Sequence, residues 1–199
     1  MSSSLIYVEI RPGPDARAHG VFADMHRAVH LSIVEQGPVL AVDYPLAAFS
    51  KIKGERIVKN GYIGDLMRVF SSEEECLRRL LGRNDVSVLI DTEGVIVGEP
   101  KRIDVVGTSS VEWVRSRDRD QCFSPSRLRR ELARGRVVTG PKRLRSTVGL
   151  ELYSYSTRQR MSLQMLRREH PERTPQLGTP NSYGLSSGST FLPVIEEVS

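Results

Sequence analysis

Short apolar runs and amphipathic stretches alternate along the first hundred residues, and glycine or proline closes most of them. The run Leu5–Ile10 is rich in β-branched residues and stops at Pro12 and Pro14, which cannot donate to a strand ladder. Between residues 16 and 35, apolar side chains recur at the 3.6-residue period of a helix, until Gly37 ends the pattern. These patterns predict a strand followed by a long helix.

Three further strands and a second helix are expected in this half. The strands are predicted at Val39–Tyr44, Gly54–Tyr62 and Val86–Ile90, and the helix over 72–82, with Ser72 and Glu75 as a capping box and Gly82 as its C-terminal cap. The resulting β-α-β-β-α-β order is that of a ferredoxin-like domain, which also underlies RNA-recognition modules. We therefore predict an α+β fold whose first domain covers residues 1–100.

Residues 101–199 are expected to form a second domain of short strands, a helix and a long loop. The strands are predicted at Ile103–Val106, at Val111–Val114 and within Leu150–Leu166, and the loop over 174–190. Ser124 caps a predicted helix that ends at Gly135. On it, Arg127, Arg130 and Arg134 share one face, whereas Leu128 and Leu132 share a stripe that should pack.

Charge is divided unevenly between the two halves. Residues 1–100 carry 11 Lys and Arg against 14 Asp and Glu, whereas residues 101–199 carry 18 against 10. The halves therefore have net charges of −3 and +8. Of the 29 basic residues, 24 are arginine, whose planar fork binds phosphate and guanine edges with two hydrogen bonds. A nucleic-acid partner is favoured for the second half, with a solvated basic surface as the alternative.

Several classes of protein are disfavoured by composition. No apolar run approaches the ~20 residues of a membrane-spanning helix, and the N-terminus has no signal-peptide pattern. A cytoplasmic protein without a membrane partner is expected. Cys76 and Cys122 lie far apart and form no CxxC, so we expect both to be reduced. No phosphate-binding loop or dinucleotide fingerprint is present, and no small-molecule cofactor is expected.

Two histidines, His26 and His30, are four residues apart on the first predicted helix and flank its apolar stripe. Both are expected to be partly buried. As an HxxxH pair they could bind a metal, but Arg27 stands where the metalloprotease motif has glutamate. Alternatively, both could be ordinary surface histidines, or one of them could act as an acid/base group. The pattern alone leaves these three interpretations open.

Hydroxyl side chains alternate along Tyr153–Thr157, so that Ser154 and Ser156 would share one face of a strand. Most such alternations are exposed strand faces. Neither Ser154 nor Ser156 lies within a GxSxG elbow or a Ser-xx-Lys motif. A serine hydrolase is therefore disfavoured.

Several short motifs are spread over nearly the whole chain. The most specific is Ser182–Ser186, which contains Tyr-Gly-Leu-Ser and is followed by Phe191-Leu192-Pro193. The others are Ile10–Pro14, Ala28–His30, Glu35–Gly37, Val42–Pro45, Ser124–Arg130 and Leu152–Thr157. In these motifs and their order the chain resembles the type I-F CRISPR repeat-processing endoribonucleases.

The resemblance implies a function and a catalytic site. It implies metal-independent cleavage of precursor crRNA at the 3′ foot of the repeat stem-loop, by attack of a 2′-hydroxyl on the adjacent phosphate. The catalytic residues that it implies are His30 as the acid/base group, Ser154 to orient the ribose, and Tyr183 to hold the site. Histidine suits proton transfer because its ordinary pKa, ~6.5, lies near neutral pH.

The resemblance also implies a set of RNA-binding residues, namely Arg115, Arg117, Arg119, Arg127, Arg129, Arg130, Arg134 and Ser156. Arg115 and Arg117 are the nearest matches to an arginine and a glutamine with which the family reads base pairs. Glu131 and Gly135 stand where relatives commonly have basic residues, which predicts fewer phosphate contacts.

Three functions remain open from the sequence. The first is a crRNA-maturing endoribonuclease that stays on the product hairpin as a subunit of the CRISPR surveillance complex. The second is a non-catalytic subunit that only binds the hairpin, and the third is a basic DNA-binding regulator. The expected partners are accordingly the crRNA repeat hairpin and the other subunits of the type I-F complex.

Overall fold

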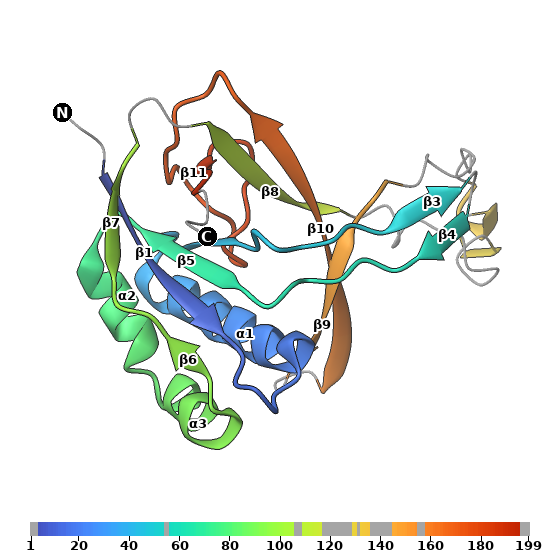
Figure 1. The fold of residues 1–199 in the computed structure, drawn as a ribbon. Helices are drawn as coiled ribbons and strands as arrows, with labels where there is room; N and C mark the ends of the chain where they lie inside the picture. Colours follow the sequence, from blue (N-terminus) through green and yellow to red (C-terminus); the bar gives the residue numbers. More distant parts are fainter. Residues whose placement is uncertain are drawn as a thin grey trace.

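The computed structural model describes residues 4–53, 56–105, 109–116, 129–130, 132–135, 145–154 and 158–195, which form a mixed α+β fold (Figure 1). The helices are α1 (Ala18–Gln36), α2 (Glu74–Leu81) and α3 (Asn84–Glu93). The strands are β1 (Ser4–Arg11), β2 (Ala41–Asp43), β3 (Lys51–Lys53), β4 (Arg56–Lys59), β5 (Met67–Ser71), β6 (Ile96–Val97), β7 (Lys101–Asp104), β8 (Ser110–Ser116), β9 (Val148–Ser154), β10 (Gln159–His170) and β11 (Leu192–Pro193).

The first sheet is antiparallel and has the order β2-β5-β1-β6, with β7 also paired to β1. Successive side chains of β1 point to opposite faces of this sheet. Ile6, Val8 and Ile10 pack in the core that contains α1 and α2. Leu5 and Tyr7 face the other way and pack with residues of the C-terminal half. The predicted ferredoxin-like arrangement is thus confirmed. Helices α1 and α2 cover one face of the sheet, and residues of the C-terminal half cover the other.

One of its predicted strands was wrong, and another lies in a different sheet. Val86–Ile90 belongs to helix α3, and the place of the fourth strand beside β1 is taken by β6 and β7. Val86, Leu89 and Ile90 have helical spacing and face the core, which the β-branched content obscured. The strand predicted within Gly54–Tyr62 is present as β4, but it pairs with β3 in a separate two-stranded sheet.

The third strand of the first sheet is instead β5, which the sequence pattern did not predict. All five of its residues are buried, so it shows no polar alternation, and Arg68 interrupts its apolar run. The Arg68 side chain is only 2% exposed because its guanidinium donates to Glu9, at 3.0 Å, and to the Ile195 carbonyl, at 3.2 Å. A buried arginine with these partners is compatible with a central strand.

The caps of α2 differ partly from the prediction. Glu73 is the N-cap residue, and its N–H donates to the Ser71 hydroxyl, whereas Ser72 and Glu75 form no capping box. Glu75 pairs instead with Arg78 and Arg79. Gly82 is the C-terminal cap, as predicted, and its N–H donates to the Arg78 carbonyl.

The second sheet has the order β11-β8-β10-β9 and is antiparallel. It confirms the strands predicted at 111–114 and within 150–166, and the strand predicted at 103–106 corresponds to β7 of the first sheet. Residues 129–130 and 132–133 are helical, and Gly135 follows them in the left-handed region, so the predicted end of the arginine-rich helix is confirmed. Leu132, however, is 59% exposed, so its predicted packing is wrong.

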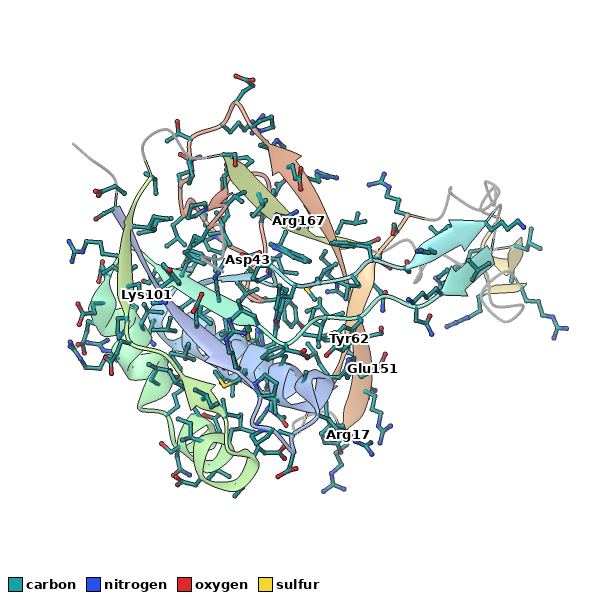
Figure 2. All side chains as sticks on the ribbon, in the orientation of Figure 1. Arg17, Asp43, Tyr62, Lys101, Glu151 and Arg167 are labelled. Atoms are coloured by element: carbon teal, nitrogen blue, oxygen red, sulfur yellow. The ribbon has the colours of Figure 1, made fainter. Side chains whose placement is uncertain are left out.

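The two sheets meet where β2 lies against β8. The indole N–H of Trp113, on β8, donates to the carboxylate of Asp43, on β2, at 2.7 Å. Asp43 is labelled near the middle of the molecule in Figure 2. Tyr44 packs edge-on against the Trp113 ring, and both side chains are buried. One core cluster therefore contains residues from both halves of the chain, among them Ile10 and Leu150. None of the described helices is long and apolar enough to cross a membrane.

Replacing Trp113 by Phe tests this junction. The change keeps most of the buried ring but leaves the Asp43 carboxylate without the indole donor, so the free energy of unfolding should fall by roughly 1–3 kcal/mol. Urea denaturation measures the loss. In an Asp43→Leu background the same replacement should cost less, and an equal cost in both backgrounds would show that the hydrogen bond is not the cause.

Candidate active site

His30 lies in the C-terminal part of α1, beside the stripe that anchors this helix in the core. Val29 and Ile33 of that stripe are buried, and they hold the neighbouring His30 at the rim, where its ring is half-buried. The Nδ1 atom of His30 lies 2.6 Å from the backbone carbonyl of Ser182. Since a carbonyl can only accept, Nδ1 carries the proton. In the neutral ring, Nε2 is then left with a lone pair that can accept a proton.

The Ser182 carbonyl belongs to a tight turn over residues 181–186. The side chain of Asn181 accepts hydrogen bonds from the N–H groups of Tyr183 and Leu185. Gly184 has a positive φ of 69°, and a Cβ there would lie only 3.3–3.4 Å from Val29, Val42 and the Leu40 carbonyl. Glycine is therefore required both by the backbone conformation and by the close approach of α1 and β2.

Tyr183 is the side chain that this turn places on His30. The two rings are stacked, with centroids 4.7 Å apart and planes 14° from parallel. Tyr183 makes two further contacts. Its hydroxyl lies 3.7 Å from the sulfur of Met161, and the Arg115 guanidinium lies 5.7 Å from its ring centroid. The structure thus brings His30, Tyr183 and Arg115 into one cluster, although they come from three distant parts of the sequence.

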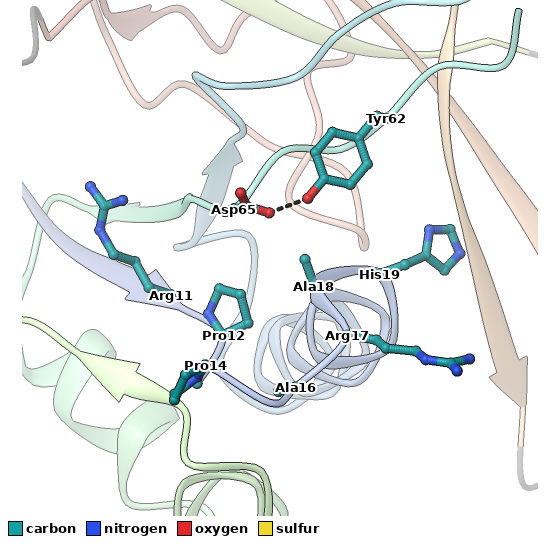
Figure 3. A pocket seen from close by; sticks show the side chains of 10 residues that line it. Arg11, Pro12, Pro14, Ala16, Arg17, Ala18, His19, Tyr62 and Asp65 are labelled. Carbon is teal, nitrogen blue, oxygen red and sulfur yellow. Dashed lines mark hydrogen bonds between the residues drawn. The ribbon is translucent and has the colours of Figure 1, made fainter.

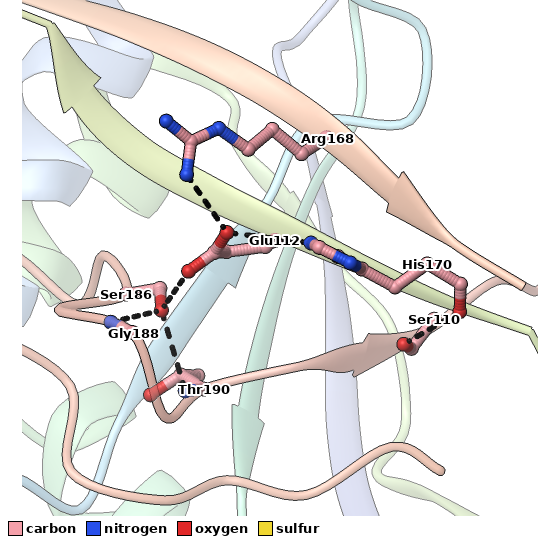
Figure 4. A network of polar contacts seen from close by, with 7 residues as sticks. All are labelled: Ser110, Glu112, Arg168, His170, Ser186, Gly188 and Thr190. Carbon is pink, nitrogen blue, oxygen red and sulfur yellow. Dashed lines mark hydrogen bonds and ion pairs between the residues drawn. The ribbon is translucent and has the colours of Figure 1, made fainter. Parts of the chain in front are cut away.

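A buried glutamate on β8 anchors the turn from the other side (Figure 4). Glu112 accepts a hydrogen bond from the hydroxyl of Ser186, at 2.8 Å, and its second oxygen lies 3.4 Å from both Arg168 and His170. Ser186 in turn accepts from the N–H groups of Gly188 and Thr190. This network holds the end of the Tyr-Gly-Leu-Ser segment against the second sheet.

Sequence reasoning missed Asn181 and Glu112 as supports of this cluster. Asn181 carried a usable signal, because asparagine two residues before a turn residue commonly accepts a hydrogen bond from the backbone. Glu112 carried none, since a single glutamate within an apolar strand has the same pattern whether or not it meets partners.

His26 has a different environment, and the expectation that it is partly buried was wrong. Its ring is fully buried, and Nδ1 lies 2.7 Å from the hydroxyl of Tyr44. Burial lowers the pKa of His26 to about 3, the nearby His30 acts in the same direction, and a backbone interaction with Tyr183 opposes both. Burial also raises the pKa of Tyr44, so its hydroxyl stays protonated and donates. His26 is therefore neutral and structural.

The remaining predicted residues are placed in part. Ser154 is the last residue of β9 and pairs with Gln159, two positions beyond the pair of Leu152 with Met161. Its backbone thus lies roughly 7 Å along the strand from the residue beside Met161. Arg129, Arg130 and Arg134 are exposed. The other predicted RNA-binding residues, Arg117, Arg119, Arg127 and Ser156, lie outside the described residues, as do Glu131 and Cys122.

A cavity of about 580 Å³ lies elsewhere, at the N-terminal end of α1 (Figure 3). It is lined by Arg11, Pro12, Gly13, Pro14, Ala16, Arg17, Ala18, His19, Tyr62 and Asp65. The Tyr62 hydroxyl donates to Asp65, and this bond raises the pKa of Tyr62. His19 and His30 are separated by about 16 Å along the helix, so the cavity is distinct from the histidine–tyrosine cluster.

A ferredoxin-like sheet joined to a second antiparallel sheet, with a basic C-terminal half, is an architecture suited to RNA binding, and His30 of α1 contacts the C-terminal half through Ser182 and Tyr183. The fold and the charge thus define the class as an α+β protein with one basic half, and the sequence match gives its family. The family model described as "CRISPR-associated protein (Cas_Csy4)" matches residues 6–194. The chain therefore belongs to the Csy4 family of type I-F systems, and the family indicated by its sequence is confirmed.

Other comparisons add little. A solved structure described as "An RAMP protein binding different RNA substrates" is similar to the chain, with 14% identity over 96% of this chain and 100% of that one and a TM-score of 0.33. No curated protein matches the sequence significantly.

The burial of His26 predicts a pH-dependent stability. Between its unfolded pKa of ~6.5 and its folded pKa of about 3, the unfolded state binds a proton that the folded state does not, so stability must fall as the pH is lowered. From pH 6.5 to pH 5, the loss from this residue should be roughly 2 kcal/mol. Urea unfolding of the wild type and of His26→Gln measures it.

The His26→Gln variant should lack this part of the pH dependence. His19→Gln, which replaces an exposed histidine on the same helix, is the matched control and should retain it. If both variants lose stability with pH as the wild type does, His26 is not the group that titrates.

Proposed function

We propose that the chain is a metal-independent endoribonuclease that cleaves CRISPR precursor RNA beside the repeat hairpin, with His30 as the general base. The observation that carries the proposal is the His30 geometry. Its Nδ1 is bound to the Ser182 carbonyl, and no hydrogen bond to its Nε2 occurs among the described residues. The ring is thus oriented, and one nitrogen is left to exchange a proton with RNA.

In the proposed reaction, Nε2 of His30 removes the proton of a ribose 2′-hydroxyl. The 2′-oxygen forms a bond to the adjacent phosphorus, the bond to the 5′-oxygen of the next nucleotide breaks, and the leaving 5′-oxygen takes up a proton from water. The products are a 2′,3′-cyclic phosphate and a 5′-hydroxyl. A positioned base typically contributes a factor of ~10² to 10⁴ to such a rate.

The neighbours of His30 have supporting roles in this proposal. Tyr183 covers one face of the imidazole and limits its rotation, and Arg115, held over the same tyrosine, can bind the phosphate as its charge grows in the transition state. Ser154, at the end of β9, is proposed to orient the ribose for in-line attack, a contribution of geometry rather than of proton transfer.

Residues 1–100 would accordingly supply the histidine, and residues 101–199 most of the contacts with the hairpin. The arginine-rich segment that includes Arg127, Arg129, Arg130 and Arg134 is proposed to lie along the deep major groove of the stem, where side chains reach phosphates more easily than base edges. Arg117, Arg119 and Ser156 are proposed as further contacts with the RNA. After cleavage the chain would remain on the hairpin as a subunit of the surveillance complex.

His30→Ala tests the chemistry. Under single-turnover conditions the cleavage rate of a labelled repeat RNA should fall by at least ~10²-fold, while the affinity for the hairpin stays within a few-fold of the wild type. His19→Gln should cleave normally. A His30→Ala variant that cleaves at the wild-type rate would exclude His30 as the base, and a wild type that binds the hairpin without cutting it would indicate a structural subunit.

The arginine-rich segment can be tested separately through salt dependence. Each phosphate contact steepens the fall of log affinity with log salt by ~0.7 to 0.9, because it releases condensed counterion. Replacing Arg127, Arg130 and Arg134 by alanine should therefore flatten the slope by about two to three and weaken all hairpins alike. An unchanged slope would show that the RNA is held elsewhere.

A further inference from the structure

The β3–β4 ribbon is unlike the rest of the chain in its basic residues. The protein has only five lysines, and three of them, Lys51, Lys53 and Lys59, lie on this ribbon together with Arg56. Elsewhere the chain uses arginine almost exclusively. Lysine presents a compact point charge on a flexible stem, which suits contact with phosphate without the geometric demands of base reading.

Strand pairing places the three lysines on one face. Lys51 pairs directly with Lys59, and Lys53 lies two residues along β3 from Lys51; both relations put side chains on the same face of a sheet. The alternate pair, Ile52 with Ile57, is half-buried and takes the other face. A bulge leaves Val58 unpaired and 61% exposed. Lys51 and Lys53 are roughly 7 Å apart along β3 and Lys59 faces Lys51, so the face is a compact group of positive charge.

This face has no internal compensation in the described part of the chain. Lys51, Lys53 and Lys59 are exposed and form none of the ion pairs that occur among the described residues, whereas Lys101 pairs with Glu9 and Arg78 and Arg79 with the glutamates of α2. Like charges paired directly across two strands are destabilising, and a two-stranded ribbon alone is marginally stable. An anionic ligand would reduce the repulsion between the lysines and would thereby stabilise the ribbon.

The base of the ribbon adjoins the C-terminal half. The N–H of Ser50 donates to the Thr147 carbonyl, at 2.9 Å, and the Thr147 N–H donates to the Ser50 hydroxyl, also at 2.9 Å. A Cβ on Gly61 would meet the same Thr147 carbonyl at 2.4 Å. Thr147 therefore packs closely against both Ser50, which precedes β3, and Gly61, which follows β4. From this base the ribbon projects away from the body of the protein (Figure 1). Thr147 immediately precedes β9, which ends in Ser154.

We propose that the β3–β4 ribbon is an additional RNA-binding element, whose lysine face contacts backbone phosphates of the repeat RNA without reading its sequence. The inference rests on the proposed function, because it takes as ligand the RNA that the C-terminal half is proposed to hold. The ribbon belongs to the first half of the chain, whose net charge is negative. Its lysines would extend the phosphate contacts beyond the arginine-rich segment.

The test compares two triple variants that remove the same charge. Lys51→Ala/Lys53→Ala/Lys59→Ala removes the face, and Arg78→Ala/Arg79→Ala/Lys101→Ala removes three exposed, ion-paired cations on α2 and β7. Affinity for the labelled repeat hairpin is measured across a salt series. The ribbon variant should flatten the slope of log affinity against log salt by about two to three, and the control by less than about one. Once RNA is saturated, both should cleave it at the wild-type rate.

A Lys→Arg triple variant of the ribbon should restore the affinity, and thermal unfolding should verify that all variants fold. If the folded ribbon variant keeps the wild-type slope, or loses no more than the control, the ribbon is an ordinary solvated surface and the inference is wrong. In that case wild-type binding and cleavage would leave the proposed function intact. A wild type that does not bind the hairpin would contradict the proposed function and the ribbon's role together.

Discussion

The hydrogen bond from the Trp113 indole to the buried Asp43 carboxylate fixes the contact between the two sheets, and the rest of the site depends on that contact. Burial raises the pKa of Asp43, and the bond from Trp113 and the nearby charge of Arg68 act against this shift. The same two strands hold the turn over residues 181–186, because the N–H of Val42 donates to the Gly184 carbonyl and the Trp113 carbonyl accepts from the Ser186 N–H. A shift of one sheet against the other would therefore move Ser182 and Tyr183 away from His30.

The two histidines of α1 illustrate how this packing assigns roles. They are one helical turn apart and both lie near Tyr183, with ring centroids 6.2 Å and 4.7 Å from it. His26 points into the core, where Tyr44 satisfies Nδ1 and desolvation keeps the ring neutral. His30 lies at the rim, bound through Nδ1 to a carbonyl, which leaves Nε2 for proton transfer. The same residue type at neighbouring positions is thus structural in one place and suited to chemistry in the other.

Local elements could be predicted wherever their periodicity was unbroken, as in α1 and β1. Prediction failed where an element's partners are distant in the sequence. β5 was missed because it contains Arg68, whose hydrogen-bond partners Glu9 and Ile195 are far along the chain. α3 was predicted as a strand because its β-branched residues are typical of strands, and only its packing in the core shows the helix. Of the candidate site, spacing alone could not separate His30 from His26. Their difference arises from contacts with Tyr44 and with a turn some 150 residues away, which no local pattern encodes. The resemblance to a family singled out His30, and its catalytic role stays a prediction.

The chemical end groups of the RNA products test the proposed reaction most directly. Repeat RNA incubated with the protein in excess EDTA should be cut at a single position beside the hairpin, with a 2′,3′-cyclic phosphate on the upstream fragment and a 5′-hydroxyl on the downstream one. Such ends require attack by the internal 2′-oxygen, which is the step assigned to His30. Cleavage that stops in EDTA, or products with a 3′-hydroxyl and a 5′-phosphate, would contradict it, since both indicate water activated by a metal ion.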